Sequence, residues 1–113
     1  MTRRFRVIEP HRAEFAEPLV VARGERLRCE RRKTQWAGWL WCAAPDGRTG
    51  WVPESWVERT GEAGVMARDY DATELTVAPG DVLDGVLTES GWLLADSPTG
   101  RRGWVPLECV EPT

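Results

Sequence analysis

The chain has 113 residues, 29% of them charged, and a formal net charge of −3. This length normally corresponds to one domain, and no apolar run approaches the roughly 20 residues of a membrane span. The composition therefore excludes a membrane-spanning helix. The basic start, Met1 to Arg6, is followed by no apolar segment, so we expect no signal peptide and a cytoplasmic location.

Catalytic and cofactor signatures are missing from the sequence. Three widely spaced cysteines predict neither a disulfide framework nor a zinc site. His11 is the single histidine, and we find no Ser/His/Asp arrangement, metal-ligand spacing or Gly-rich phosphate loop. We therefore expect a non-enzymatic protein without a cofactor.

Short runs with a period of two residues predict strands along the whole chain. The expected strands are residues 5–8, 19–21, 26–30, 39–42, 51–52, 56–57, 65–67, 75–77, 82–83, 92–95, 104–105 and 109–110. Residues 10–18 and 31–37 are expected to be loops, and residues 53–55 a single helical turn. No helical period occurs anywhere, which indicates an all-β fold.

One seven-residue sequence motif occurs twice in the chain, with a single substitution. The sequence GRTGWVP at residues 47–53 returns as GRRGWVP at residues 100–106, and a Gly-Trp pair precedes each at the same distance. A match over most of each half indicates two copies of one structural unit. We therefore predict two domains, residues 1–59 and 63–113, joined by a short linker over residues 59–64.

The second copy resembles the Src-homology-3 (SH3) family. The resemblance rests on an ordered set of short motifs: Asp69-Tyr70-Asp71-Ala72, Glu74-Leu75, Gly80-Asp81-Val82-Leu83, Gly91-Trp92 and Gly103-Trp104-Val105-Pro106. The first copy is similar through fewer of these motifs. The resemblance implies two SH3-like five-stranded barrels in tandem, as in bacterial variant SH3 proteins.

The resemblance also implies a peptide-binding groove lined by aromatic residues. Family members bind extended, proline-rich peptides, and acidic residues select a basic residue of the ligand. In the first unit the matching positions are His11, Glu14, Glu17, Trp36, Trp39, Pro53 and Trp56. The second unit keeps Tyr70, Trp92 and Pro106 but has Arg68 and Cys109 where the family has tyrosines. We expect the first unit to bind a protein or peptide and the second groove to be weaker.

Two other functions remain open at this point. A basic strip, formed by Arg26, Arg28, Arg31, Arg32 and Lys33, lies near Trp36 and Trp39 and resembles a nucleic-acid footprint. The acidity of the whole chain counts against it. A structural or oligomerisation module would instead use its aromatic residues in internal contacts. The sequence specifies neither the partner nor the oligomeric state.

Side-chain alternation assigns several further residues to the two faces of the strands. Cys29 and Cys42 are expected in the core as small apolar residues, whereas Trp41 and Trp51 are expected on the outer face, opposite one another across a hairpin. Leu94 and Trp104 hold the same places in the second copy. Cys109 is expected at the groove.

The charge is distributed unevenly along the chain. Residues 1–58 carry 11 basic and 8 acidic side chains, a net charge of +3, and residues 59–113 carry 4 and 10, a net charge of −6. Opposite charges of this kind favour docking of the halves or attraction of different partners.

Overall fold

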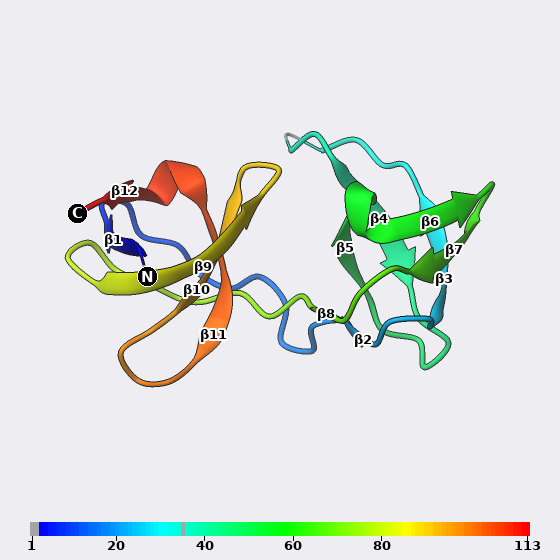
Figure 1. Cartoon of the computed structure of the whole chain (residues 1–113), viewed down its shortest axis with the longest axis horizontal. Helices are drawn as coiled ribbons and strands as arrows, with labels where there is room; N and C mark the ends of the chain where they lie inside the picture. Colours follow the sequence, from blue (N-terminus) through cyan, green and yellow to red (C-terminus); the bar gives the residue numbers. More distant parts are fainter. Residues whose placement is uncertain (1–2, 35) are drawn as a thin grey trace. The chain divides into compact units, whose positions relative to one another are not determined.

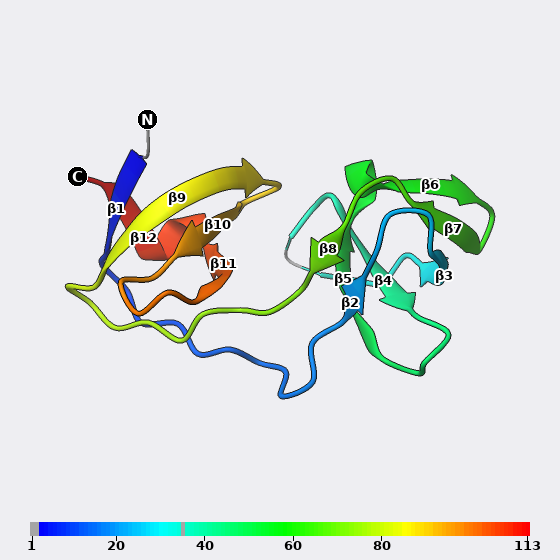
Figure 2. The same cartoon turned by 60° about the horizontal axis from the view of Figure 1, so that its bottom comes forward.

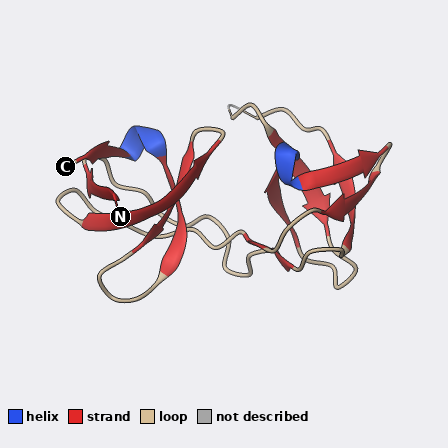
Figure 3. Ribbon diagram, viewed as in Figure 1, coloured by secondary structure: helices blue, strands red, loops and turns tan. Residues whose placement is uncertain are grey.

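Strands and two 3-10 turns form the regular structure of this computed structural model, which describes residues 3–34 and 36–113 (Figure 3). In chain order the elements are β1 (Arg3–Val7), β2 (Val20–Val21), β3 (Arg26–Glu30), β4 (Trp39–Ala43), β5 (Thr49–Pro53), η1 (Glu54–Trp56), β6 (Val57–Thr60), β7 (Ala63–Met66), β8 (Tyr70–Asp71), β9 (Val82–Glu89), β10 (Trp92–Asp96), β11 (Arg102–Pro106), η2 (Leu107–Cys109) and β12 (Val110–Pro112). The predicted all-β class is confirmed.

The strands form two antiparallel five-stranded sheets and one short pair. One sheet has the order β11-β10-β9-β1-β12, the other has the order β5-β4-β3-β7-β6, and β2 pairs with β8 (Figure 1). Two five-stranded sheets agree with the expected pair of SH3-like barrels. The predicted strand at residues 75–77 is reduced to an isolated bridge of Val77 with His11, and a separate bridge joins the preceding Glu74 to Trp104.

The chain does not divide at residue 60. One compact unit consists of Met1–Ala16 together with Thr73–Thr113, and we call it the discontinuous unit. The other consists of Glu17–Ala72, and we call it the inserted unit. The predicted boundaries, 1–59 and 63–113, are therefore wrong: β1 pairs with β9 and β12, although the sequential order would have paired it with β3 and β6 (Figure 2).

A tight hairpin explains why the strands are exchanged. The predicted linker over residues 59–64 is absent, because β6 and β7 pair directly, with Thr60 opposite Ala63. Gly61 has a φ of +64°, in the left-handed region that a two-residue turn requires. Strand β7 therefore returns along β6 and completes the inserted unit, taking the place that the sequential order would have given to β1.

Charges on the paired strands favour the same arrangement. Arg4 of β1 lies opposite Asp84 of β9, with Arg4 Nε 3.5 Å from a carboxylate oxygen. Arg28 of β3 lies opposite Ala63 of β7 and pairs with Glu62 at 3.6 Å. If β1 took the place of β7, the same register would put Arg4 directly opposite Arg28, and like charges at such positions are destabilising.

Each unit has its own apolar core. The core of the discontinuous unit contains Phe5, Val7, Leu75, Val77, Leu83, Leu93, Ala95, Val105 and Val110. The buried apolar residues of the inserted unit include Leu19, Leu27, Cys29, Leu40, Cys42, Val52 and Met66. Cys29 and Cys42 thus occupy the inward positions that the alternation predicts.

The new division also changes the charge distribution. The discontinuous unit carries 6 Arg or Lys and 9 Asp or Glu side chains, a net charge of −3, and the inserted unit carries 9 of each. The contrast of +3 and −6 between the sequence halves therefore does not exist between the folded units. An electrostatic attraction based on that contrast has no support in the structure.

Candidate functional site: a composite aromatic site

A tryptophan and a proline face one another at the same place in both units. Trp92 at the start of β10 lies opposite Pro106 at the end of β11, and Trp39 lies opposite Pro53 in the inserted unit. Each proline precedes a 3-10 turn that is fixed by a backbone hydrogen bond, Leu107 N–H to the Gly91 carbonyl in the discontinuous unit. The repeated sequence therefore produces a repeated Trp–Pro pair.

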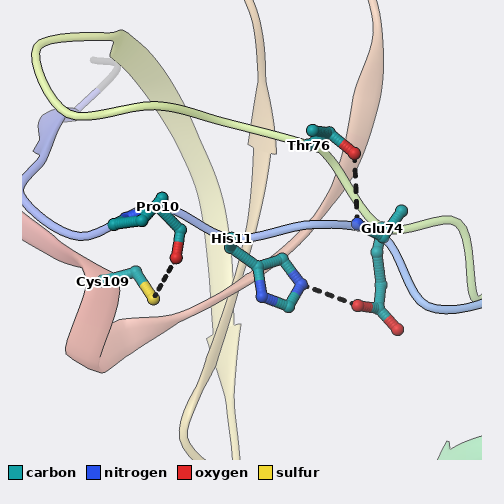
Figure 4. Close-up of polar contacts among 6 residues, drawn as sticks. Pro10, His11, Glu74, Thr76 and Cys109 are labelled. Atoms are coloured by element: carbon teal, nitrogen blue, oxygen red, sulfur yellow. Dashed lines mark hydrogen bonds and ion pairs between the residues drawn. The ribbon is translucent and has the colours of Figure 1, made fainter.

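Because β1 belongs to the discontinuous unit, the segment that follows it brings His11 beside Trp92. The rings of His11 and Trp92 meet edge to face with centroids 5.5 Å apart. His11 Nε2 lies 2.7 Å from a carboxylate oxygen of Glu74, and both side chains are largely buried (Figure 4). Backbone hydrogen bonds join His11 to Val77 in both directions, at 3.1 and 2.8 Å. The histidine is therefore held in a fixed orientation beside the tryptophan.

Cys109 and two exposed carboxylates lie beside the chain just before His11. The Cys109 thiol lies 4.0 Å from the Pro10 carbonyl oxygen, and the Glu9 amide donates to the Cys109 carbonyl (Figure 4). Burial, followed by the nearby charges of Glu108 and Glu9, raises the pKa of the Cys109 thiol. Cys109 therefore stays protonated at neutral pH, and the exposed Glu9 and Glu108 give this surface negative charge.

The corresponding aromatic residues of the inserted unit are covered. Trp39 and Trp56 are each only 6% exposed, and Tyr70 is buried as well. The Arg68 guanidinium lies 3.8 Å from the centre of the Trp56 ring, and Tyr70 meets Trp56 edge to face at 5.6 Å. The open trough expected around Trp39 and Trp56 is therefore absent in the inserted unit.

The predicted groove residues are divided between the units. His11 and Glu14 belong to the discontinuous unit with Trp92 and Pro106, whereas Glu17, Trp36, Trp39, Pro53 and Trp56 belong to the inserted unit with Tyr70. Glu14 and Glu17 are exposed, and Trp36 is half-buried. Each predicted set is therefore divided between the two units, because β1 and β7 have exchanged places.

Ion pairs neutralise much of the basic strip. Arg31 forms a double hydrogen bond with Glu54, at 2.6 and 3.4 Å, and Glu54 raises the pKa of the Arg31 guanidinium through these bonds. Arg28 pairs with Glu62, and Arg32 with Glu30. Alternating charges of this kind do not present the continuous positive face that nucleic-acid backbones require.

The outer-face tryptophan pair forms as predicted. Trp41 and Trp51 lie opposite one another with ring centroids 5.2 Å apart, and Arg32 covers Trp41 at 4.7 Å. In the discontinuous unit Trp104 lies opposite Leu94, as expected, but it is only 2% exposed. The backbone of Thr73 and Leu75 hydrogen-bonds to Trp104 and holds this segment against β11.

Two residues of the site are missing from the sequence-based prediction. A carboxylate oxygen of Glu74 is hydrogen-bonded to His11 Nε2, and Thr76 Oγ1 accepts a hydrogen bond from the Ala13 amide at 3.1 Å (Figure 4). Their partners, His11 and Ala13, are each 63 positions away in the chain. A prediction that assigns these segments to different domains has no signal that would bring them together.

A comparison with known families agrees with the resemblance. Residues 4–59 match the variant SH3 domain. The match covers β1 to β6 almost completely, so it follows the repeat in sequence order and spans both folded units. No solved structure matches the chain. SH3-type domains are generally non-catalytic binding modules.

Among residues 3–34 and 36–113, no helix is long and apolar enough to span a bilayer.

Proposed function

We propose that this SH3-like protein is a non-catalytic binding module, and that the discontinuous unit takes an extended, basic peptide segment along Trp92 and His11. The observation that carries the proposal is the different exposure of the two tryptophans, Trp92 and Trp39. Trp92 is half-buried, whereas Trp39 is buried and Arg68 lies over the neighbouring Trp56. A ring that stacks on a ligand must be accessible, which supports the Trp92 side.

The chemistry of this site supports a basic, proline-containing ligand. A flat indole face offers apolar surface to an extended backbone, and a preformed left-handed helix loses little entropy when it binds. The exposed carboxylates of Glu9 and Glu108 lie beside Cys109 and favour an Arg or Lys side chain at that end. A shallow site of this kind gives an affinity of roughly micromolar Kd.

Titration with a labelled proline-rich peptide tests the proposal. The probe contains one arginine, and a matched probe has glutamate in its place. We expect the arginine peptide to bind the full chain with roughly micromolar Kd. Trp92→Ala should weaken binding about tenfold or more, which corresponds to the loss of about 1.4 kcal/mol.

A matched tryptophan in the other unit provides the control. Trp36 is half-buried in a loop of the inserted unit, so Trp36→Ala should leave binding unchanged. Glu9→Gln together with Glu108→Gln should reduce the preference for the arginine peptide. The proposal is wrong if Trp36→Ala abolishes binding while Trp92→Ala does not, or if both peptides bind equally.

A further inference from the structure

Two of the three cysteines meet in the core of the inserted unit. Cys29 of β3 and Cys42 of β4 are direct partners in the antiparallel ladder, and both are fully buried. Their Sγ atoms are 3.0 Å apart. Because a disulfide joins its sulfur atoms at about 2.05 Å, an approach of about 1 Å would allow a bond. Cysteines 13 positions apart in the chain thus form a close pair in space.

The surrounding backbone holds the two sulfur atoms in this position. Strand β3 pairs with β4 on one side and with β7 on the other. The Cys29 amide donates to the Glu62 carbonyl at 2.7 Å, and a Cβ on Gly64 would lie 2.9 Å from Cys29 Sγ. The pair is therefore set by a central strand that pairs on both sides, and its geometry does not depend on a mobile loop.

We propose that Cys29 and Cys42 are a dithiol that oxidised glutathione, or another low-molecular-weight disulfide, converts to a disulfide linking β3 to β4. The thiolate of one cysteine attacks the small disulfide, forms a mixed disulfide and releases one small thiolate. The second cysteine then attacks the protein sulfur of the mixed disulfide and releases the other small thiolate. The two protein thiols lose their protons, and the small disulfide is reduced to two thiols.

Burial determines when this exchange takes place. Burial and the neighbouring Cys29 raise the pKa of the Cys42 thiol. Only a thiolate attacks a disulfide, so the closed inserted unit reacts slowly. Oxidation therefore proceeds before the unit folds or when it opens. Once formed, the bond is protected from reductants by the same burial.

The test uses the full chain with Cys109→Ser, which leaves only the two core thiols. The protein is refolded in glutathione redox buffers of known composition and also equilibrated in concentrated urea. Intact mass and peptide mapping then measure the Cys29–Cys42 disulfide. We expect its effective concentration to be at least about tenfold higher under native conditions, because the fold holds the sulfur atoms together. Closing this short loop should raise the Tm by on the order of 10 °C.

Single-cysteine chains provide the control. Cys42→Ser and Cys29→Ser, each combined with Cys109→Ser, should form only mixed disulfides with glutathione and gain no Tm. If either variant fails to fold, the comparison between native conditions and urea still decides, since it requires no substitution in the core. The proposal is overturned if the effective concentration under native conditions is equal to or below that in urea, or if glutathione mixed disulfides are the stable products.

Discussion

The ring of Phe5 in β1 lies against the α-carbon of Gly85 in β9. A Cβ on Gly85 would come within 2.6 Å of Phe5 Cε1. In the inserted unit the sizes are reversed: Gly64 of β7 lies against Cys29 of β3, and a Cβ on Gly64 would come within 2.9 Å of Cys29 Sγ. Each unit therefore combines one larger side chain with one glycine.

The strand register makes these two contacts equivalent. Phe5 pairs with Leu83 in the discontinuous unit, and Gly64 pairs with Leu27 in the inserted unit. Pairing in sequence order would put Phe5 against the cysteine of β3 and the two glycines against one another. One unit would then be overpacked and the other would contain a void, and both defects are destabilising. Steric complementarity therefore favours the exchange of β1 and β7.

The first prediction concerns the fit of Phe5 on β9. Gly85→Ala should destabilise the protein by about 1–3 kcal/mol, because the added methyl group collides with the Phe5 ring. Adding Phe5→Leu to this variant should recover part of the loss. Urea denaturation gives both values. Val86→Ala, at an exposed neighbouring position, is the control and should change the stability little. Equal stability of Gly85→Ala and the wild type would contradict the contact.

The second prediction concerns fragments of the chain. Residues 17–72 contain a complete sheet, β5-β4-β3-β7-β6, and the β2–β8 pair. We expect this fragment to fold alone, with dispersed amide resonances and cooperative thermal unfolding. Residues 1–59, of similar length, lack β7 and should remain largely unfolded. The opposite result, a folded 1–59 and an unfolded 17–72, would contradict the nested arrangement.

The third prediction concerns the cover of Trp56. Arg68 stacks on this ring, and an exposed cation–π contact contributes about 0.5–1 kcal/mol. Arg68→Ala should lower the stability by this amount and increase quenching of tryptophan fluorescence by acrylamide. Arg23→Ala, at another exposed position of the inserted unit, should not change the quenching. Unchanged quenching in Arg68→Ala would show that other groups cover Trp56.

The fourth prediction concerns the ion pair on the hairpin of β10 and β11. Arg102 donates two hydrogen bonds to Asp96, at 2.7 and 3.0 Å, and lowers the pKa of this carboxyl group. Because the folded pKa is lowered, the pair stabilises the fold above the unfolded value of about 3.9. This contribution is lost as the pH falls through the folded pKa.

Carboxyl NMR measures the titration of Asp96 directly. In Arg102→Ala its pKa should return toward the ordinary range, and Arg101→Ala should leave it unchanged. Since both side chains are exposed, we expect the effect on stability to be small and to weaken with salt. An Asp96 titration that Arg102→Ala does not move would rule out the pair in solution.

Local features of the fold could be predicted from the sequence. Period-two alternation identified strand β3 and the inward positions of Cys29 and Cys42, and the repeated Gly-Trp motifs placed Trp39 and Trp92 at the start of equivalent strands. These features depend on neighbours within a few residues or on a hairpin partner. Local sequence is sufficient for them.

The assignment of strands to units could not be predicted in the same way. Because of the repeat, β1 and β7 hold corresponding positions in the two units. The motifs alone do not indicate which sheet each strand joins. The choice depends on long-range partners, such as Arg4 with Asp84, and on the turn at Gly61, which the sequence alone does not distinguish from a linker. The composite site follows from this choice, which places His11 in the same unit as Trp92.

Nuclear Overhauser contacts of the Phe5 ring in the unmodified protein test the nested arrangement most directly. The account predicts contacts from the ring protons of Phe5 to the α-protons of Gly85 and none to the β-protons of Cys29. Contacts from Phe5 to Cys29, without any to Gly85, would show that the strands pair in sequence order and would contradict the account.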